Sequence, residues 1–290
     1  MTCLELDKFV IDLKALKYLI RGCPLLQELR FTNFICMECI KIVAPNLCHL
    51  IVDGTFKSLK VINAEKLVSA VIGLQKPVDL SVDVSHQDRL GVLLQDLASS
   101  SKLQKLVFSG HFVKTIYGIV MPPPTFEKLK NLDLSSIHMN NVDEFCSIIS
   151  IIQNCPAIER LNISVSTSKD ETDHLLEYNP NLVLQRLCYA NVKIRKGSNM
   201  ELMLIEFLLK CSPILKNLSI TPSASIESTF TKPVLFELVS FCRASQNVKV
   251  RFLPPVSVSR DSSSDESSSD ESYSAADESS SSEESESESD

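Results

Sequence analysis

The amino-acid sequence predicts an α/β repeat fold, in which short parallel strands alternate with helices, followed by a polar tail. Two observations support the fold: a Leu-x-apolar unit recurs along residues 1–256, and an apolar helical pattern precedes several of its copies. A third observation separates the tail. Residues 257–290 contain 17 serines, 12 acids and one base, a net charge of −11, which leaves +4 for residues 1–256 out of a chain total of −7.

Three segments show the repeat most clearly: LIRGCPLLQELRF (19–31), IIQNCPAIERLNI (151–163) and LLKCSPILKNLSI (208–220). Each has an apolar helical end, a cysteine, a proline and then a Leu-x-apolar unit. The first leucine of the successive units is Leu4, Leu29, Leu50, Leu106, Leu132, Leu161, Leu187 and Leu218, and Ala70 fills the long gap. This spacing is typical of an irregular leucine-rich-repeat solenoid.

Helices are expected before several of the strands, at residues 12–22, 88–98, 141–154 and 199–211, where apolar residues recur at i, i+3, i+4 and i+7. Asp12, Asn140/Asn141 and Asn199 are the expected helix starts. Proline then ends a helix and favours an extended strand. Each unit is therefore expected to be a helix, a turn and a short strand, and neighbouring units must stack because one unit cannot bury its own apolar face.

The stack predicts a concave face of parallel strands and a convex face of helices. In each Leu-x-apolar strand the middle residue points outward. These middle residues are Glu5, Arg30, Ile51, Val107, Asp133, Asn162, Cys188 and Ser219. All except Cys188 are the candidate partner-binding residues, with a merely solvated sheet face as the alternative.

No catalytic residue, cofactor or metal site is predicted. The seven glycines form no GxG, GxSxG or GxxxxGK[ST] motif, and the five histidines are scattered. Cys36, Cys39, Cys48 and His49 resemble a metal cluster, but a packing role for these cysteines is favoured. The chain is interpreted as a binding protein and not as an enzyme.

Nucleic acid and membranes are not expected partners. Lys193, Arg195 and Lys196 form only a short basic segment without an aromatic platform, which favours a solvated loop. No apolar run is long enough to cross a bilayer, and the N-terminus carries no basic signal region. Ten cysteines without such a signal indicate free thiols and an intracellular protein of the nucleus or cytoplasm.

Residues 257–290 are expected to be disordered, because so polar a segment has no apolar core to bury. Nine serines have an acid three residues later, which suits an acid-directed kinase of the casein type. They are Ser262, Ser263, Ser267, Ser268, Ser274, Ser280, Ser281, Ser285 and Ser287. The tail is either a regulated electrostatic handle or only a solubilising extension.

Two segments resemble the plant F-box/FBD/LRR-repeat family. APNLCHLIVDGTFKSLKVINAEKLVSAVIG (44–73) is similar to a pattern of that family, and residues 201–222 with 235–253 resemble its FBD domain, including Arg243, Ala244 and Ser245. The resemblance implies leucine-rich repeats over 1–198, an FBD-like region over 199–256 and the tail over 257–290.

The resemblance also implies a function: substrate recognition within an SCF-type cullin ubiquitin ligase, with ubiquitination performed by partner proteins. Family members begin with an F-box, which docks the Skp adaptor and carries a tryptophan. This sequence has no tryptophan, and its residues 3–7 already read as a repeat strand, so an N-terminally shortened member is expected. The alternatives are a nuclear acidic-tailed repeat protein that binds basic proteins such as histones, and an inactive or dominant-negative remnant.

Overall fold

The structure is a computed structural model that describes residues 1–10, 12–76, 85–112, 124–139, 142–168, 182–223 and 238–254. Residue contacts divide the chain into Met1–Val256 and Ser257–Asp290. The second unit, with its nine candidate phosphorylation sites, lies outside the described residues, as do Asn140 and Asn141, and residues 235–237 of the FBD-like segment. The proposed boundary between residues 198 and 199 stays a prediction.

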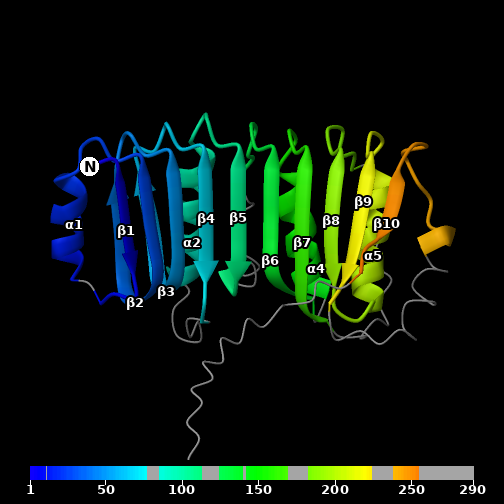
Figure 1. Cartoon of the computed structure of the whole chain (residues 1–290), viewed down its shortest axis with the longest axis horizontal. Coiled ribbons are helices and arrows are strands. Elements are labelled where there is room, and N and C mark those ends of the chain that lie inside the picture. Colours follow the sequence, from blue (N-terminus) through cyan, green and yellow to red (C-terminus); the bar gives the residue numbers. More distant parts are fainter. Residues whose placement is uncertain are drawn as a thin grey trace, which may run out of the picture. The chain divides into compact units, whose positions relative to one another are not determined.

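Ten parallel strands form one sheet in sequence order among the described residues of the first unit (Figure 1). The strands are β1 (Cys3–Asp7), β2 (Glu28–Val43), β3 (His49–Ile62), β4 (Ser69–Leu74), β5 (Lys105–Gly110), β6 (Asn131–Met139), β7 (Arg160–Ser168), β8 (Tyr189–Ile194), β9 (Asn217–Pro222) and β10 (Lys249–Phe252). The helices are α1 (Leu13–Arg21), α2 (Ser85–Ala98), α4 (Val142–Gln153) and α5 (Asn199–Cys211). The predicted α/β class is confirmed, and a sheet whose order follows the sequence is compatible with a solenoid.

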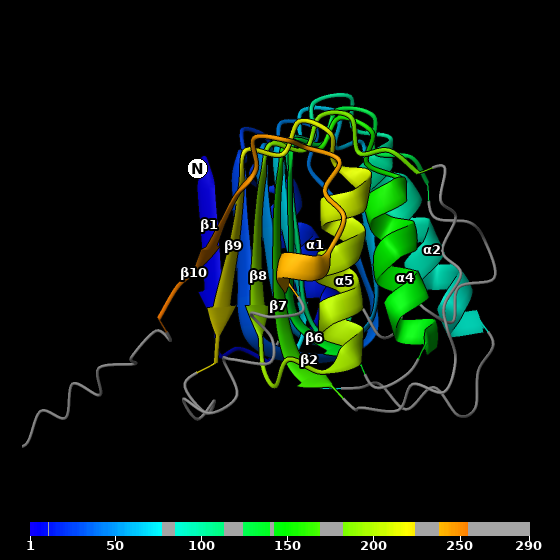
Figure 2. The same ribbon diagram turned by 90° about the vertical axis from the view of Figure 1, so that its right-hand side faces the viewer.

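Helices α2, α4 and α5 lie on the same side of the sheet, and the other side carries no helix of the described residues (Figure 2). We call this second side the open face. The four expected helices are present, with bounds shifted by up to three residues. Asp12 caps α1, as expected, by accepting a hydrogen bond from the backbone N–H of Lys14 at 3.0 Å.

A buried leucine or isoleucine closes the turn before most strands. Its backbone N–H donates to the carbonyl three residues earlier, at 3.0 to 3.4 Å. These residues are Leu26, Leu47, Leu67, Leu103, Leu129, Ile158, Leu187 and Leu215. The repeat is therefore two apolar residues three positions apart, one in the turn and one in the strand.

The expected strand at Leu187 is wrong by three residues. Register pairs Leu161 of β7 with Ala190 of β8, so Leu187 is the turn residue and Ala190 is the strand residue. The outward middle residue of this unit is Asn191, and Cys188 lies before the strand. The error arose because Ala190 is small, so that the preceding leucine resembled the strand position.

The expected helices between β2 and β3 and between β3 and β4 are also wrong, because strands occupy these places. After register shifts at Thr32/Phe34 and Cys36/Cys39, residues 39–43 of β2 pair with residues 58–62 of β3. We call this pair the return ribbon. The repeat intervals here are only 21 and 20 residues, which leaves too little chain for a helix, and Ile40 and Ile42 are buried while Lys41 and Val43 are exposed.

The α5 start is held by a buried carboxylate. Glu201 is fully buried and accepts hydrogen bonds from the backbone N–H groups of Arg195 at 2.6 Å and Ser198 at 2.9 Å. The Ser198 hydroxyl accepts one from Glu201 N–H at 3.4 Å, which completes a capping box. The chain segment that leads from β8 into α5 is thereby fixed.

Candidate functional site

One row of side chains crosses the open face at the third residue of each strand. Each member pairs in register with the next, and neighbouring strands lie about 4.8 Å apart. The row is Glu5, Arg30, Ile51, Val71, Val107, Asp133, Asn162, Asn191, Ser219 and Arg251. We call it the central row. It contains all seven candidate residues, whose partner-binding role stays a prediction.

A second outward row lies two residues earlier on each strand, and sequence reasoning did not consider it. Its members are Cys3, Glu28, His49, Ser69, Lys105, Asn131, Arg160, Tyr189, Asn217 and Lys249. We call it the first row. The alternation of strand side chains was the signal for it, because the residue before each buried strand leucine must also face outward.

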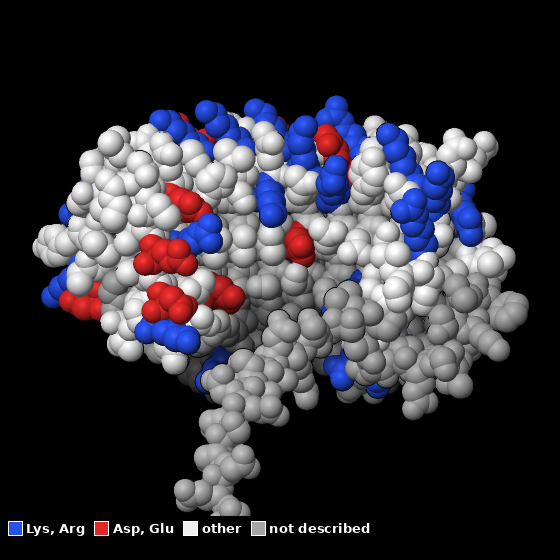
Figure 3. Space-filling model, in the orientation of Figure 1, with Lys and Arg blue, Asp and Glu red and all other residues white. Residues whose placement is uncertain are grey.

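Acidic residues gather on the open face over β1–β3 (Figure 3). They are Glu5, Asp7, Glu28 and Asp53. Arg30 offsets one of them, because its guanidinium forms an ion pair with the Glu28 carboxylate at 2.6 Å. The hydrogen bonds from Arg30 lower the pKa of Glu28, which favours its charged form.

Asp7 is fixed by hydrogen bonds from the next strand. Its Oδ1 accepts from the Thr32 hydroxyl at 2.6 Å and from the Asn33 amide at 2.7 Å. Asn33 has φ +54°, at the first register shift of β2, and this conformation turns its amide toward Asp7. The two donors, Thr32 first, lower the pKa of Asp7.

Cations replace the acids over β5–β10. Lys105, Arg160, Lys193, Lys249 and Arg251 face outward there, and Asp133 is the one acid of the paired outward positions on these strands. Between the two regions the central row is apolar, with the half-buried side chains of Ile51, Val71 and Val107. The open face therefore runs from acidic through apolar to basic.

A hollow of about 570 Å³ lies in the basic part. Eight first-row and central-row residues of β5–β9 line it, together with Ala190 of β8: Lys105, Asn131, Arg160, Asn162, Tyr189, Asn191, Asn217 and Ser219. We call it the β5–β9 hollow. Two cations and four amides provide many donors there, and none of the lining residues is an acid.

Arg160 and Tyr189 form the middle of the hollow. They are register partners on β7 and β8, and the guanidinium carbon lies 5.0 Å from the centre of the tyrosine ring. This cation–π contact leaves the N–H groups of Arg160 for a ligand, because Arg160 forms no ion pair with a described residue. Asp133, beside the hollow, accepts a hydrogen bond from the Ser135 hydroxyl at 2.6 Å.

The other sequence candidates do not assemble into a site. Within the described residues no group of three or more His, Cys, Asp or Glu side chains has the arrangement of a metal site. All ten cysteines are described and none forms a disulfide. The repeat cysteines Cys23, Cys155 and Cys211 are buried where helices end.

No helix in the described part of the chain has the length and apolarity needed to cross a membrane.

The comparison with curated proteins finds a relative. The chain is 27% identical over 259 residues to an F-box/FBD/LRR-repeat protein of Arabidopsis thaliana. The match covers 86% of this chain and 61% of the relative, so the chain spans about three fifths of that protein's length. No family model matches the chain. The similarity supports the relationship that the sequence motifs indicate, to the plant F-box/FBD/LRR-repeat proteins.

Proposed function

We propose that this chain is a non-catalytic protein-interaction module, an irregular leucine-rich-repeat solenoid whose open face binds a protein substrate. The observation that carries the proposal is the β5–β9 hollow, where hydrogen-bond donors of arginine, lysine and asparagine side chains gather on the open face of the sheet. The Arabidopsis relative is named as a leucine-rich-repeat protein, and this name supports a role in protein interaction.

The chemistry of the hollow favours a carboxylate-bearing or phosphorylated segment of the substrate. Arg160 offers a planar pair of donors that fits a carboxylate or phosphate, and Lys105 adds a second positive charge two strands away. The amides of Asn131, Asn162 and Asn191 donate to and accept from a peptide backbone. An extended acidic segment that crosses β5–β9 can pair its charges with the two cations and its backbone groups with the amides.

The charge gradient of the open face supports a defined direction of binding. A substrate with an acidic end over the hollow, an apolar centre over Val71 and Val107 and a basic end over β1–β3 matches the face. The reversed orientation places like charges together and costs affinity. Complementary charge of this kind contributes specificity and association rate more than raw affinity.

The proposed cellular context is an SCF-type cullin ubiquitin ligase, in which the chain recognises the substrate and partner proteins perform the ubiquitination. The Arabidopsis relative is named as an F-box protein and is longer than this chain, which spans 61% of it. Affinity purification of the full chain from plant cells tests this coupling. Recovery of the Skp adaptor and cullin supports it, and their absence reduces the proposal to substrate binding alone.

The hollow itself is tested by charge reversal. Arg160→Glu should abolish substrate capture in the same purification, because it replaces the central donor by a carboxylate. Arg186→Glu is the matched control, since Arg186 is exposed in the turn before β8 and does not line the hollow. Equal capture by both variants contradicts a binding role for the hollow.

The alternative function, binding of basic proteins such as histones, depends on residues 257–290. That binding is expected to be salt-sensitive and to be lost when the tail is deleted. Substrate binding at the hollow is expected to survive the deletion. An acid-directed kinase acting on the tail serines belongs to the same proposal, and phosphopeptide mapping of the purified full chain tests it.

A further inference from the structure

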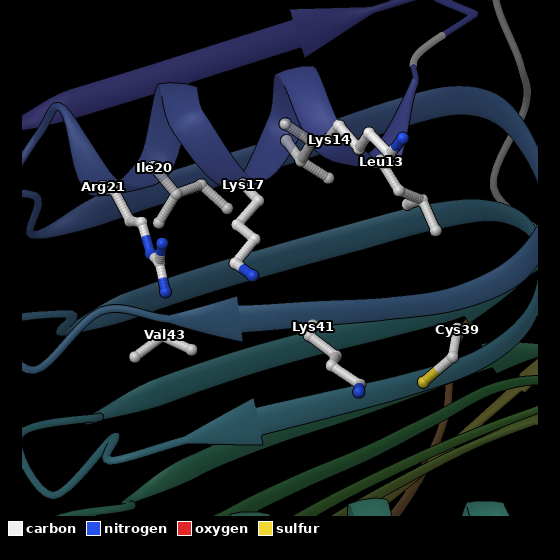
Figure 4. Close-up of a pocket in the computed structure, with 9 residues that line it drawn as sticks. Leu13, Lys14, Lys17, Ile20, Arg21, Cys39, Lys41 and Val43 are labelled. Carbon is white, nitrogen blue, oxygen red and sulfur yellow. The ribbon is translucent and has the colours of Figure 1, made fainter.

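A second groove lies away from the open face, between α1 and the return ribbon (Figure 4). Its volume is about 550 Å³. Leu13, Leu16 and Ile20 of α1 form one apolar wall, and Cys39 and Val43 of β2 lie on the other side. Leu16 and Ile20 are buried, so the apolar surface that faces solvent comes from the half-buried Leu13 and from Val43, which is 44% exposed.

Four cations border the groove: Lys14, Lys17 and Arg21 from α1, and Lys41 from the return ribbon. The residues that line it include no acid. None of the four cations forms an ion pair with a described residue. The groove therefore combines an apolar wall with uncompensated positive charge, and it is complementary to a ligand that is both apolar and acidic.

The return ribbon has an open backbone edge on this side. Residues 39–43 pair with β3, whereas β1 pairs only with residues 28–32 of β2, so no described strand lies on the α1 side of residues 39–43. The opposite edge of the ribbon is covered, because Asp96 of α2 accepts a hydrogen bond from the backbone N–H of Val61 at 3.2 Å. An uncovered parallel edge is a template for an added strand.

We propose that this groove binds an extended acidic segment of a partner protein, which adds as a strand to the edge of residues 39–43. Helix α1 has nine residues and is about 14 Å long, room for about four strand residues at 3.3 Å each. In an added strand, alternate side chains point to opposite faces. Apolar side chains then contact the half-buried Leu13 and the exposed Val43, while acidic ones reach Lys17 and Lys41.

The test uses the full chain and three fluorescein-labelled hexapeptides in a fluorescence anisotropy titration. The first peptide alternates valine with glutamate, the second alternates valine with lysine, and the third keeps the glutamates but replaces two valines by proline. We expect only the first to bind well. The lysine peptide should bind at least about tenfold more weakly because its charge is reversed, and the proline peptide likewise because proline donates no backbone hydrogen bond.

Two charge-reversed variants localise the binding. Lys41→Glu is expected to weaken binding of the valine–glutamate peptide at least about tenfold. Lys60→Glu is the matched control: Lys60 is the register partner of Lys41 in the ribbon but does not line the groove, and a change within about twofold is expected. Lys17→Glu, on the exposed side of α1, replaces Lys41→Glu if circular dichroism shows that the latter is unfolded.

Protection of one thiol gives an independent readout. Cys39 lines the groove and is half-buried, so bound peptide should slow its alkylation, while alkylation of exposed Cys242 stays unchanged. The proposal is overturned if the proline peptide binds as tightly as the valine–glutamate peptide. It is also overturned if Lys41→Glu and Lys60→Glu weaken peptide binding equally, or if saturating valine–glutamate peptide does not slow the alkylation of Cys39. Because the groove and the β5–β9 hollow share no lining residue, none of these results decides whether the hollow binds a substrate.

Discussion

The guanidinium carbon of Arg160 lies 5.0 Å from the centre of the Tyr189 ring on the adjacent strand. Both side chains belong to the first row of the open face and both are exposed. The tyrosine ring therefore positions the guanidinium at the surface and leaves its charge in place. A carboxylate partner would position it too, but would neutralise the charge. A fixed and uncompensated guanidinium is an arrangement suited to binding an external anion.

This pair should show a measurable coupling. A double-mutant cycle with Arg160→Ala and Tyr189→Ala is expected to give about 0.5–1 kcal/mol in urea unfolding, the range of exposed cation–π contacts. Tyr189→Phe should retain most of the coupling, because the ring face and not the hydroxyl makes the contact. Additive effects of the two alanine substitutions would mean that the contact does not hold the guanidinium.

The buried Glu201 carboxylate should contribute strongly to stability. Glu201→Ala leaves the N–H groups of Arg195, Lys196 and Ser198 without their acceptor, and we expect a loss of about 3 kcal/mol in the free energy of unfolding. Glu206→Ala is the control on the same helix. It removes only the i,i+4 ion pair with Lys210, worth about 0.5 kcal/mol or less. Similar losses for both variants would contradict the capping role.

Asp96 should make the stability depend on pH in a defined direction. Burial raises the pKa of Asp96, although the hydrogen bond from Val61 opposes the shift. A carboxyl whose folded-state pKa is raised contributes stability below its unfolded pKa of about 3.9 and loses it as the pH rises through the folded value. Asp96→Asn keeps an acceptor for Val61 N–H and carries no charge.

We therefore expect Asp96→Asn to be at least as stable as the parent chain at pH 7, with the advantage shrinking toward pH 4. Asp96→Ala lacks the acceptor and should be less stable at both values. Chemical unfolding at a series of pH values measures all three proteins. An Asp96→Asn variant that is less stable than the parent at pH 7 would contradict the direction of the shift.

Thiol reactivity should separate buried from exposed cysteines. Burial raises the pKa of Cys155 to about 12, so this thiol is neutral and shielded at pH 8. Mass spectrometry after brief alkylation of the native chain should find Cys3, Cys146 and Cys242 modified and Cys155 unmodified. In denaturant all should react. Modification of Cys155 at the rate of Cys242 would indicate that the helix end around it opens.

Much of this architecture could be predicted from the sequence, because large buried apolar residues recur at the same position of most repeats. The leucines of β1, β2, β3, β5, β6, β7 and β9 marked the correct strand positions, and the helical periodicities predicted the four helices α1, α2, α4 and α5 of the described residues. The prediction failed at Ala190, where a small residue takes the place of a leucine. The turn leucine three residues earlier then resembled the strand.

The return ribbon could not be predicted by analogy with the other units, in which a helix precedes the strand. The short repeat intervals in this part of the sequence did indicate it. Intervals of 20 and 21 residues leave no room for a helix, and the alternation of Ile40, Lys41 and Ile42 is that of a strand. The hollow was missed for a different reason. Its first-row members, Lys105, Arg160 and Tyr189, are scattered in the sequence and become neighbours only through the register of β5–β8.

A photo-crosslinking amino acid at Asn162, within the hollow, reports directly whether a substrate contacts the open face. The control carries it at Gln153, exposed at the end of α4 on the helix-covered side. Both full-length proteins are irradiated in plant cells. Substrate binding by the open face predicts a discrete protein adduct from Asn162 that is lost with Arg160→Glu and is absent from Gln153. Adducts of equal yield from both positions, unaffected by Arg160→Glu, would contradict it.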